Sequence, residues 1–242
     1  MADEILDVYE FPEQDIRYYA EACAKVAGEL KRVSPHSIVC PLRGGYPPTR
    51  IVTKLCDYNG RVHLLPTSAF VSGREDLVKE GFDRAFQDAK EEGVKAPRIA
   101  IIDTAISGTS LRKLNEELKR EFPQFKKKYG DISIYMAKVW KAKSPNQLKG
   151  GRFRFDKYNS ELPIYHATAF VRELLCEDRP ELLGIDYPFS TDRDRKSSYA
   201  EPVCAKKQIR VKRDGSVTEY APCPTTADTL VNIVCVYARK GV

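Results

Sequence analysis

The sequence predicts an α/β protein with a parallel sheet and helices on both faces, because short apolar strands alternate with amphipathic helices along the first 140 residues. Polar, glycine-containing stretches follow two of these strands, which is where parallel sheets bind ligands. The chain has 242 residues, 42% hydrophobic and 31% charged, which is enough for one such domain with an appendage.

Hydrophobic periodicity predicts the order of the elements. Apolar residues recur at helical spacing from Ile16 to Leu30, and runs such as "SIVC" and "RVHLLP" are typical of short strands. In chain order we expect a helix at 13–32, a strand at 37–40, a helix at 49–58, a strand at 61–66, a helix at 75–90, a strand ending at Asp103, a helix with the apolar stripe Leu111, Leu114, Leu118 and Phe122, and a strand at 132–140.

The pattern changes after residue 140. Residues 141–200 mix many charges with short apolar runs and are expected to be irregular, whereas "QIRVKRDGSVTEYA" predicts a β-hairpin across Asp214-Gly215. We therefore expect a first domain at residues 1–190 and a β-rich C-terminal extension at residues 191–242. This extension holds 10 Lys and Arg against 6 Asp and Glu, so it could meet a nucleic acid or a protein partner, or simply be a solvated face.

The stretch "IIDTAISGTS" places an acid at a strand end and small hydroxyl residues at a helix start. Backbone N–H groups and the helix dipole favour an anion there, so we expect a phosphate to bind at Ser107, Gly108, Thr109 and Ser110. Asp103 would repel that phosphate and is better suited to ribose hydroxyls or a magnesium ion. The alternative is structural: Ser107 caps the helix and Asp103 merely ends a strand.

A second loop repeats this arrangement after the first strand, in "CPLRGGYPP". Arg43 offers a charged fork, and Gly44 and Gly45 offer bare backbone N–H groups, a combination suited to pyrophosphate. The alternative is an ordinary loop with an exposed arginine. Neither stretch fits the P-loop or the GxGxxG pattern, which disfavours a kinase or a dehydrogenase.

Together the two loops resemble those of the type I phosphoribosyltransferase family. The resemblance implies a doubly wound parallel sheet with a small hood, and binding of phosphoribosyl pyrophosphate (PRPP) with Mg²⁺. Asp103 would contact the ribose hydroxyls and the metal, residues 107–110 would hold the 5′-phosphate, and Arg43, Gly44 and Gly45 would lie in the pyrophosphate loop. The implied reaction transfers ribose 5-phosphate to a nucleobase-like acceptor and releases pyrophosphate.

Further positions follow from the same resemblance. The segment "CEDRPELLGIDYP" is similar to a late segment of hypoxanthine-guanine phosphoribosyltransferases, in which Asp186 would meet the metal. Lys138 or Lys141, after the fourth strand, would read the base. A lid at residues 66–84 would close over the site with Arg74 and Lys79 as its cations. The alternative for both cations is a solvated helix face.

Two departures from the family pattern support a second hypothesis. Ile102 replaces the first acid of the usual pair, and Ile106 stands where purine enzymes often place a general base. The chain could therefore be a catalytically degenerate member that senses a nucleotide, binds nucleic acid or binds a protein partner, for example within a bacterial multi-gene system. In either case we expect an oligomer.

Composition excludes other classes. No apolar run reaches the roughly 20 residues that span a bilayer, and the acidic N-terminus is unlike a leader peptide. Seven cysteines without CxxC pairs suggest reduced thiols in a cytoplasmic protein. A zinc site from Cys204, Cys223, Cys235 and a histidine is disfavoured by its irregular spacing.

Overall fold

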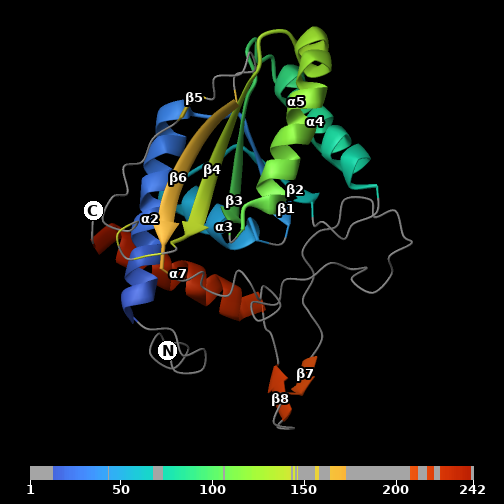
Figure 1. Ribbon diagram of the computed structural model, residues 1–242. Coiled ribbons are helices and arrows are strands. Elements are labelled where there is room, and N and C mark those ends of the chain that lie inside the picture. Colours follow the sequence, from blue (N-terminus) through green and yellow to red (C-terminus); the bar gives the residue numbers. More distant parts are fainter. Residues whose placement is uncertain are drawn as a thin grey trace.

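A computed structural model of the protein has a central sheet with helices on both faces (Figure 1). The predicted α/β class and parallel sheet are confirmed. The structure describes residues 13–42, 44–67, 73–105, 107–142, 144, 146, 156–157, 164–172, 208–211, 217–220 and 224–240.

The sheet has the strand order β2-β1-β3-β4-β6-β5. Five of its strands run parallel, and only the two-residue edge strand β5 (Asp156–Lys157) is antiparallel. The parallel strands are β1 (Ser37–Leu42), β2 (Arg61–Pro66), β3 (Arg98–Ala105), β4 (Ser133–Lys141) and β6 (Ile164–Val171). Their carboxyl ends therefore meet at one edge of the sheet, which is the edge that positions the candidate site.

Each face of the sheet has its own apolar core. The first core lies under α2 (Glu13–Val33), α3 (Tyr46–Leu55) and α7 (Pro224–Lys240), and the second under α4 (Arg74–Glu91) and α5 (Thr109–Tyr129). Side chains of a strand alternate between faces, so Ala100 and Ile102 of β3 enter the first core and Ile99 and Ile101 enter the second.

Several predicted boundaries were wrong, and among them β1 extends to Leu42 and α3 ends at Leu55. Strand β3 does not stop at Asp103, because Thr104 and Ala105 continue the pairing with Val139 and Trp140 of β4. Helix α3 begins at Tyr46 rather than at residue 49, since proline is well tolerated in the first turn of a helix, where no backbone N–H is required.

Three elements, β5, β6 and α7, were missed in the sequence. Residues 164–171, expected to be irregular, form β6 and pair in parallel with β4. The expected hairpin is present as β7 (Gln208–Val211) and β8 (Val217–Tyr220), but the extension is not purely β-rich. It ends in α7, which packs on α2 and α3 (Figure 1). The expected domain boundary at 190/191 and the hood lie outside the described residues.

Among the described residues, no helix has the length and apolarity that crossing a membrane requires.

Candidate functional site

Asp103 lies near the carboxyl edge of the sheet and is buried, with 7% of its surface exposed. By strand alternation it shares the face of Ile101, under α4 and α5. Its Oδ1 accepts a 2.8 Å hydrogen bond from the backbone N–H of Thr104. Burial raises the pKa of this carboxyl group to about 7, while the Thr104 N–H and the positive charge of Arg74 act in the opposite direction.

The Gly44-Gly45 turn lies directly against β3 beside this carboxyl group. A Cβ on Gly45 would come within 2.6 Å of the backbone oxygens of Ile102 and Pro41. A Cβ on Gly44 would come within 2.6 Å of Thr104 Oγ1 and 3.4 Å of Asp103 Oδ1. Glycine is thus needed here because the turn approaches β3 closely. The turn and Asp103 therefore lie next to each other at the edge of the sheet.

The predicted phosphate loop forms the start of α5. Gly108 is the N-cap residue, and its φ of +75° is in the left-handed region that favours glycine. The Ser107 hydroxyl accepts a 3.4 Å hydrogen bond from the Thr109 backbone N–H and donates one of 3.2 Å to Thr109 Oγ1. Gly108 itself supplies no side-chain cap, and Ser107 accepts the Thr109 N–H as the structural alternative expects. The N–H groups of a first helical turn point out of the helix start, which is the arrangement that binds anions.

Arg74 connects α4 to this loop. The residue is buried, and its Nη2 donates a 3.3 Å hydrogen bond to the backbone oxygen of Ser110. The same nitrogen lies 3.3 Å from Glu117 Oε2, in an ion pair with little exposure. Arg74 also lowers the pKa of Asp103, so its charge acts at the site. The structure thus places Arg74 in a packed helix and not on a solvated face.

Lys138 lies on β4 in register with Asp103 of β3, so the two residues occupy the same face of adjacent strands. Its Nζ lies over the Trp140 ring, 5.8 Å from the ring centre, in a cation–π contact. Lys138 and Trp140 line a pocket of about 300 Å³ between β4 and α5, together with Ser107, Gly108 and Thr109. The predicted phosphate loop and one of the two predicted base-reading lysines therefore meet in a single pocket.

The other predicted residues are placed differently. Lys141 ends β4 and is not among the described residues that line this pocket. Lys79 lies on α4, half-exposed and 3.6 Å from Glu121. Residues 74–84 of the expected lid are the first part of this helix. Arg43, Ile106 and Asp186 lie outside the described residues.

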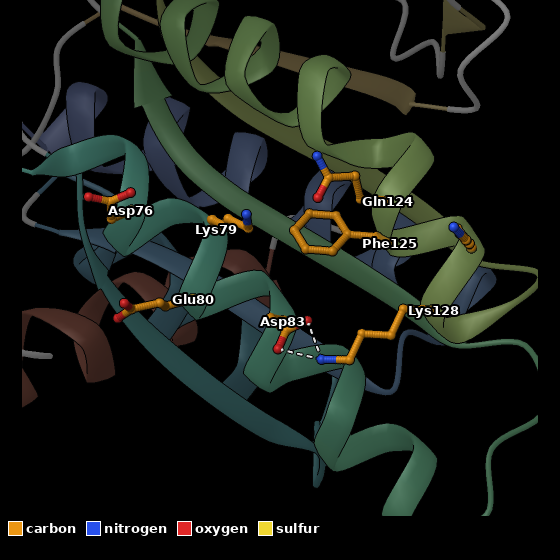
Figure 2. Close-up of a pocket in the computed structure, with 8 residues that line it drawn as sticks. Asp76, Lys79, Glu80, Asp83, Gln124, Phe125 and Lys128 are labelled. Atoms are coloured by element: carbon orange, nitrogen blue, oxygen red, sulfur yellow. Dashed lines mark hydrogen bonds and ion pairs between the residues drawn. The ribbon is translucent and has the colours of Figure 1, made fainter.

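A larger groove of about 840 Å³ runs between α4 and α5 (Figure 2). Lys128 bridges it by hydrogen bonds of 2.9 and 2.8 Å to the two carboxylate oxygens of Asp83. Its α5 wall, from Gln124 to Lys128, begins 16 residues beyond Gly108, which is about 24 Å along a helix. This groove is therefore remote from the carboxyl edge, and Lys79 is its only predicted site residue among those described.

Of three comparisons with known proteins, the one with solved structures gave a match. No family model matches the sequence, and no curated protein matches it. Among solved structures, the chain is similar to a purine phosphoribosyltransferase from Pyrococcus horikoshii Ot3, with 15% sequence identity and a TM-score of 0.29 over 50% of this chain and 73% of that one. The function proposed below therefore rests on this chain's own residues.

Sequence reasoning missed five residues of the pocket, which are Leu111, Arg112, Asn115, Met136 and Trp140. Asn115 lines the pocket from the second turn of α5 and is 8% exposed. The signal was available, since Asn115 is four residues after Leu111 and directly follows Leu114, so it falls on the apolar stripe of the helix. A polar residue on a buried stripe needs a hydrogen-bond partner, and Asn115 Oδ1 has none among the described residues.

The site offers limited protein ligation for Mg²⁺. Within the described part of the chain, no three His, Cys, Asp or Glu side chains are grouped to hold a metal ion. Among the described residues, Asp103 supplies the carboxylate at this edge of the sheet, and its Oδ1 already accepts a hydrogen bond from the Thr104 N–H. Such a site fits a magnesium ion that takes most of its ligands from substrate oxygens and water.

Proposed function

We propose that this chain is a phosphoribosyltransferase-like protein. It binds PRPP, or the 5′-phosphate of a nucleotide, and transfers ribose 5-phosphate to a nucleobase-like acceptor with release of pyrophosphate. One observation carries the proposal: the Gly44-Gly45 turn lies against the buried Asp103, and α5 starts six residues later, at Thr109. Two anion-binding backbone segments thus flank one carboxyl group at the carboxyl edge of the sheet.

Each segment has a distinct task in the proposed reaction. The first turn of α5 would hold the 5′-phosphate through backbone N–H groups and the hydroxyls of residues 107–110. The Gly44-Gly45 turn would accept the pyrophosphate, with Arg43 as its cation. Asp103 would orient the ribose hydroxyls, and its negative charge would stabilise the positive charge that develops on the ribose in the transition state.

A magnesium ion held by Asp103 and substrate oxygens would neutralise charge on the pyrophosphate. Asp103 can do this only when it is ionised. Because burial raises its pKa to about 7, part of the population holds the proton at neutral pH. Arg74 opposes this effect and is therefore a positioning residue of the site, one that acts through Asp103.

A second candidate function is nucleotide binding without transfer. It is favoured by Ile102, the position of the missing first acid, which is fully buried in the core opposite Asp103. The site then has one acid where the family pattern has two. A nucleic-acid or protein partner on the basic extension, an oligomeric state and a cytoplasmic location remain predictions.

Isothermal titration calorimetry with PRPP and Mg²⁺ tests the proposal. We expect binding to the wild type, and a loss of about 10- to 100-fold in Asp103→Asn, because a charge-assisted hydrogen bond contributes roughly 1.5–3 kcal/mol. Asp131→Asn is the matched control: Asp131 is exposed after α5, at the opposite edge of the sheet, and should change nothing.

Pyrophosphate release then separates the two candidates. Release in the presence of any one of a panel of purine and pyrimidine bases supports the transferase. PRPP binding without release with any base supports the non-catalytic alternative. A wild-type protein that binds neither PRPP nor ribose 5-phosphate would overturn the transferase, and one that also binds no nucleotide would overturn both candidates.

A further inference from the structure

The start of α5 is covered by the indole ring of Trp140. A Cβ on Gly108, the N-cap residue of this helix, would come within 2.8 Å of Trp140 Cη2 and 3.4 Å of its Cζ2 and Cζ3. Carbon atoms in contact normally lie about 3.5–4.0 Å apart, so the outer edge of the ring lies directly against the glycine. A side chain at position 108 would therefore displace either the tryptophan or the cap.

The N-cap of α4 provides a comparison. Gly73 caps α4 with a φ of +68°, Gly108 caps α5 with a φ of +75°, and neither supplies a side-chain hydrogen bond. A Cβ on Gly73, however, would meet no described atom within 4 Å. The left-handed conformation accounts for glycine in both caps. Of these two caps, the one at Gly108 is the one that a side chain covers.

Trp140 is itself fixed by the sheet. It belongs to β4, which lies between β3 and β6, and it is in register with Ala105 on one side and Phe170 on the other. The ammonium group of Lys138, two residues earlier on the same face, lies over its ring. A side chain on a strand is positioned more precisely than one on a loop. The ring therefore gives the N-cap of α5 a defined place.

Gly108 does not provide this order by itself. Glycine has the widest choice of backbone conformations, and the hydrogen bonds that join Ser107 and Thr109 around it are exposed. The N–H groups of a first helical turn bind an anion only while they keep a common direction. Fixing the backbone of one residue corresponds to roughly 5- to 30-fold in a binding constant. A contact that fixes Gly108 before the ligand arrives therefore raises the affinity by a factor of this order.

We propose that Trp140 is a positioning residue for the 5′-phosphate. It acts through Gly108 and not on the ligand, and it holds the start of α5 in the conformation in which the N–H groups of residues 109–111 point at the phosphate. The inference rests on the proposed function for the identity of the anion. Its mechanism rests on the contact between Trp140 and Gly108.

The binding test uses Trp140→Phe, because phenylalanine keeps an apolar ring on β4 but lacks the outer ring atoms that face Gly108. In titration calorimetry, ribose 5-phosphate should bind this variant about tenfold more weakly than the wild type. Phe125→Leu is the matched control. It removes a ring from the other end of α5, where Phe125 packs on Phe86, and it should bind ribose 5-phosphate as the wild type does.

Urea unfolding of four glycine variants tests the contact itself. Gly108→Ala should destabilise the protein more than Gly73→Ala, because both alanines are strained at positive φ but the one at position 108 also meets the ring. In the Trp140→Phe background, the loss caused by Gly108→Ala should become smaller, while the loss caused by Gly73→Ala stays the same. An equal loss from Gly108→Ala in both backgrounds would overturn the inference, since the ring would then not touch the cap in solution.

The binding data separate positioning from a structural role and from a failure of the proposed function. Equal losses of affinity in Trp140→Phe and Phe125→Leu would assign Trp140 to the fold and overturn the inference. If Trp140→Phe binds ribose 5-phosphate as tightly as the wild type, the inference is overturned and the proposed function stands. If the wild type binds neither ribose 5-phosphate nor PRPP, the transferase and the positioning role are refuted together, whatever the glycine variants show.

Discussion

Asp103 combines two requirements that conflict. Its place beside the Gly44-Gly45 turn suits a ligand, but burial opposes the charge that the ligand chemistry needs. In the folded protein the pKa of the carboxyl group is raised from 3.8 to about 7. Below about pH 4 both the folded and the unfolded state hold the proton. Between pH 4 and 7 only the folded state holds it, so raising the pH in this window lowers stability.

Asp103→Asn should therefore stabilise the free protein in a pH-dependent way. The amide oxygen can still accept the Thr104 N–H, but no buried charge forms. The advantage of the variant over the wild type should grow by about 2–3 kcal/mol between pH 5 and pH 8, since each pKa unit corresponds to about 1.4 kcal/mol. Urea unfolding at both pH values measures it.

Asp131→Asn serves as control, because Asp131 is exposed and its variant should follow the wild type at both pH values. An advantage of Asp103→Asn that is equal at pH 5 and pH 8 would mean that Asp103 does not change its charge over this range.

At the scale of elements, α4 and α5 are joined by one buried ion pair near the site and by exposed pairs elsewhere. Arg74 and Glu117 form the buried pair, and burial raises the pKa of Glu117. The pair of Lys128 and Asp83, across the groove in Figure 2, is largely exposed. Exposed pairs contribute little to stability, whereas a buried charge without its partner is strongly unfavourable.

Arg74→Met should destabilise the protein by about 3 kcal/mol, because it leaves Glu117 buried without its cation and removes the hydrogen bond to the Ser110 oxygen. The double variant Arg74→Met/Glu117→Met should recover most of this loss, since two apolar side chains then face each other. A double-mutant cycle by urea unfolding measures the coupling. A loss in the double variant equal to the sum of the losses in Arg74→Met and Glu117→Met alone would show that the two side chains do not interact in solution.

At the scale of the molecule, local signals predicted the first four strands and the first four described helices, because each combines its own periodicity with glycine or proline at its ends. They did not predict β6. Buried Ala167, Ala169 and Val171 alternate with partly exposed Thr168 and Phe170 in the strand. The hydrophobicity of "IYHATAFV" does not follow this alternation, so it resembles any short apolar run between charges. The segment becomes recognisable as a strand only through its parallel pairing with β4.

Helix α7 was missed for the opposite reason. Its sequence is rich in valine, isoleucine and threonine, which favour strands, yet its buried residues recur at helical spacing. These are Leu230, Val231, Ile233, Val234, Cys235 and Ala238. In the site too, local signals and tertiary packing contribute separately. The sequence located both glycine loops and Asp103. The partners of Arg74 and the pocket around Asn115 form only when α4, α5 and β4 pack together.

The packing of α7 bears on whether the C-terminal extension is a separate unit. Val234 is fully buried in the first core, and Val236, two residues further along, is 49% exposed. If α7 completes the core of the sheet, Val234→Ala should lower the stability of the whole protein by about 2 kcal/mol, from two lost methyl groups and the cavity they leave. Val236→Ala should change it by less than about 0.5 kcal/mol.

Urea unfolding, followed both by far-ultraviolet circular dichroism and by the fluorescence of Trp140 on β4, decides the matter. Trp140 lies on the face of the sheet opposite α7, so its signal reports on the sheet and not on the helix itself. A Val234→Ala transition that shifts equally in both signals means that α7 and the sheet unfold as one cooperative unit. A tryptophan transition that Val234→Ala leaves unmoved would instead separate the extension from the domain that holds the site.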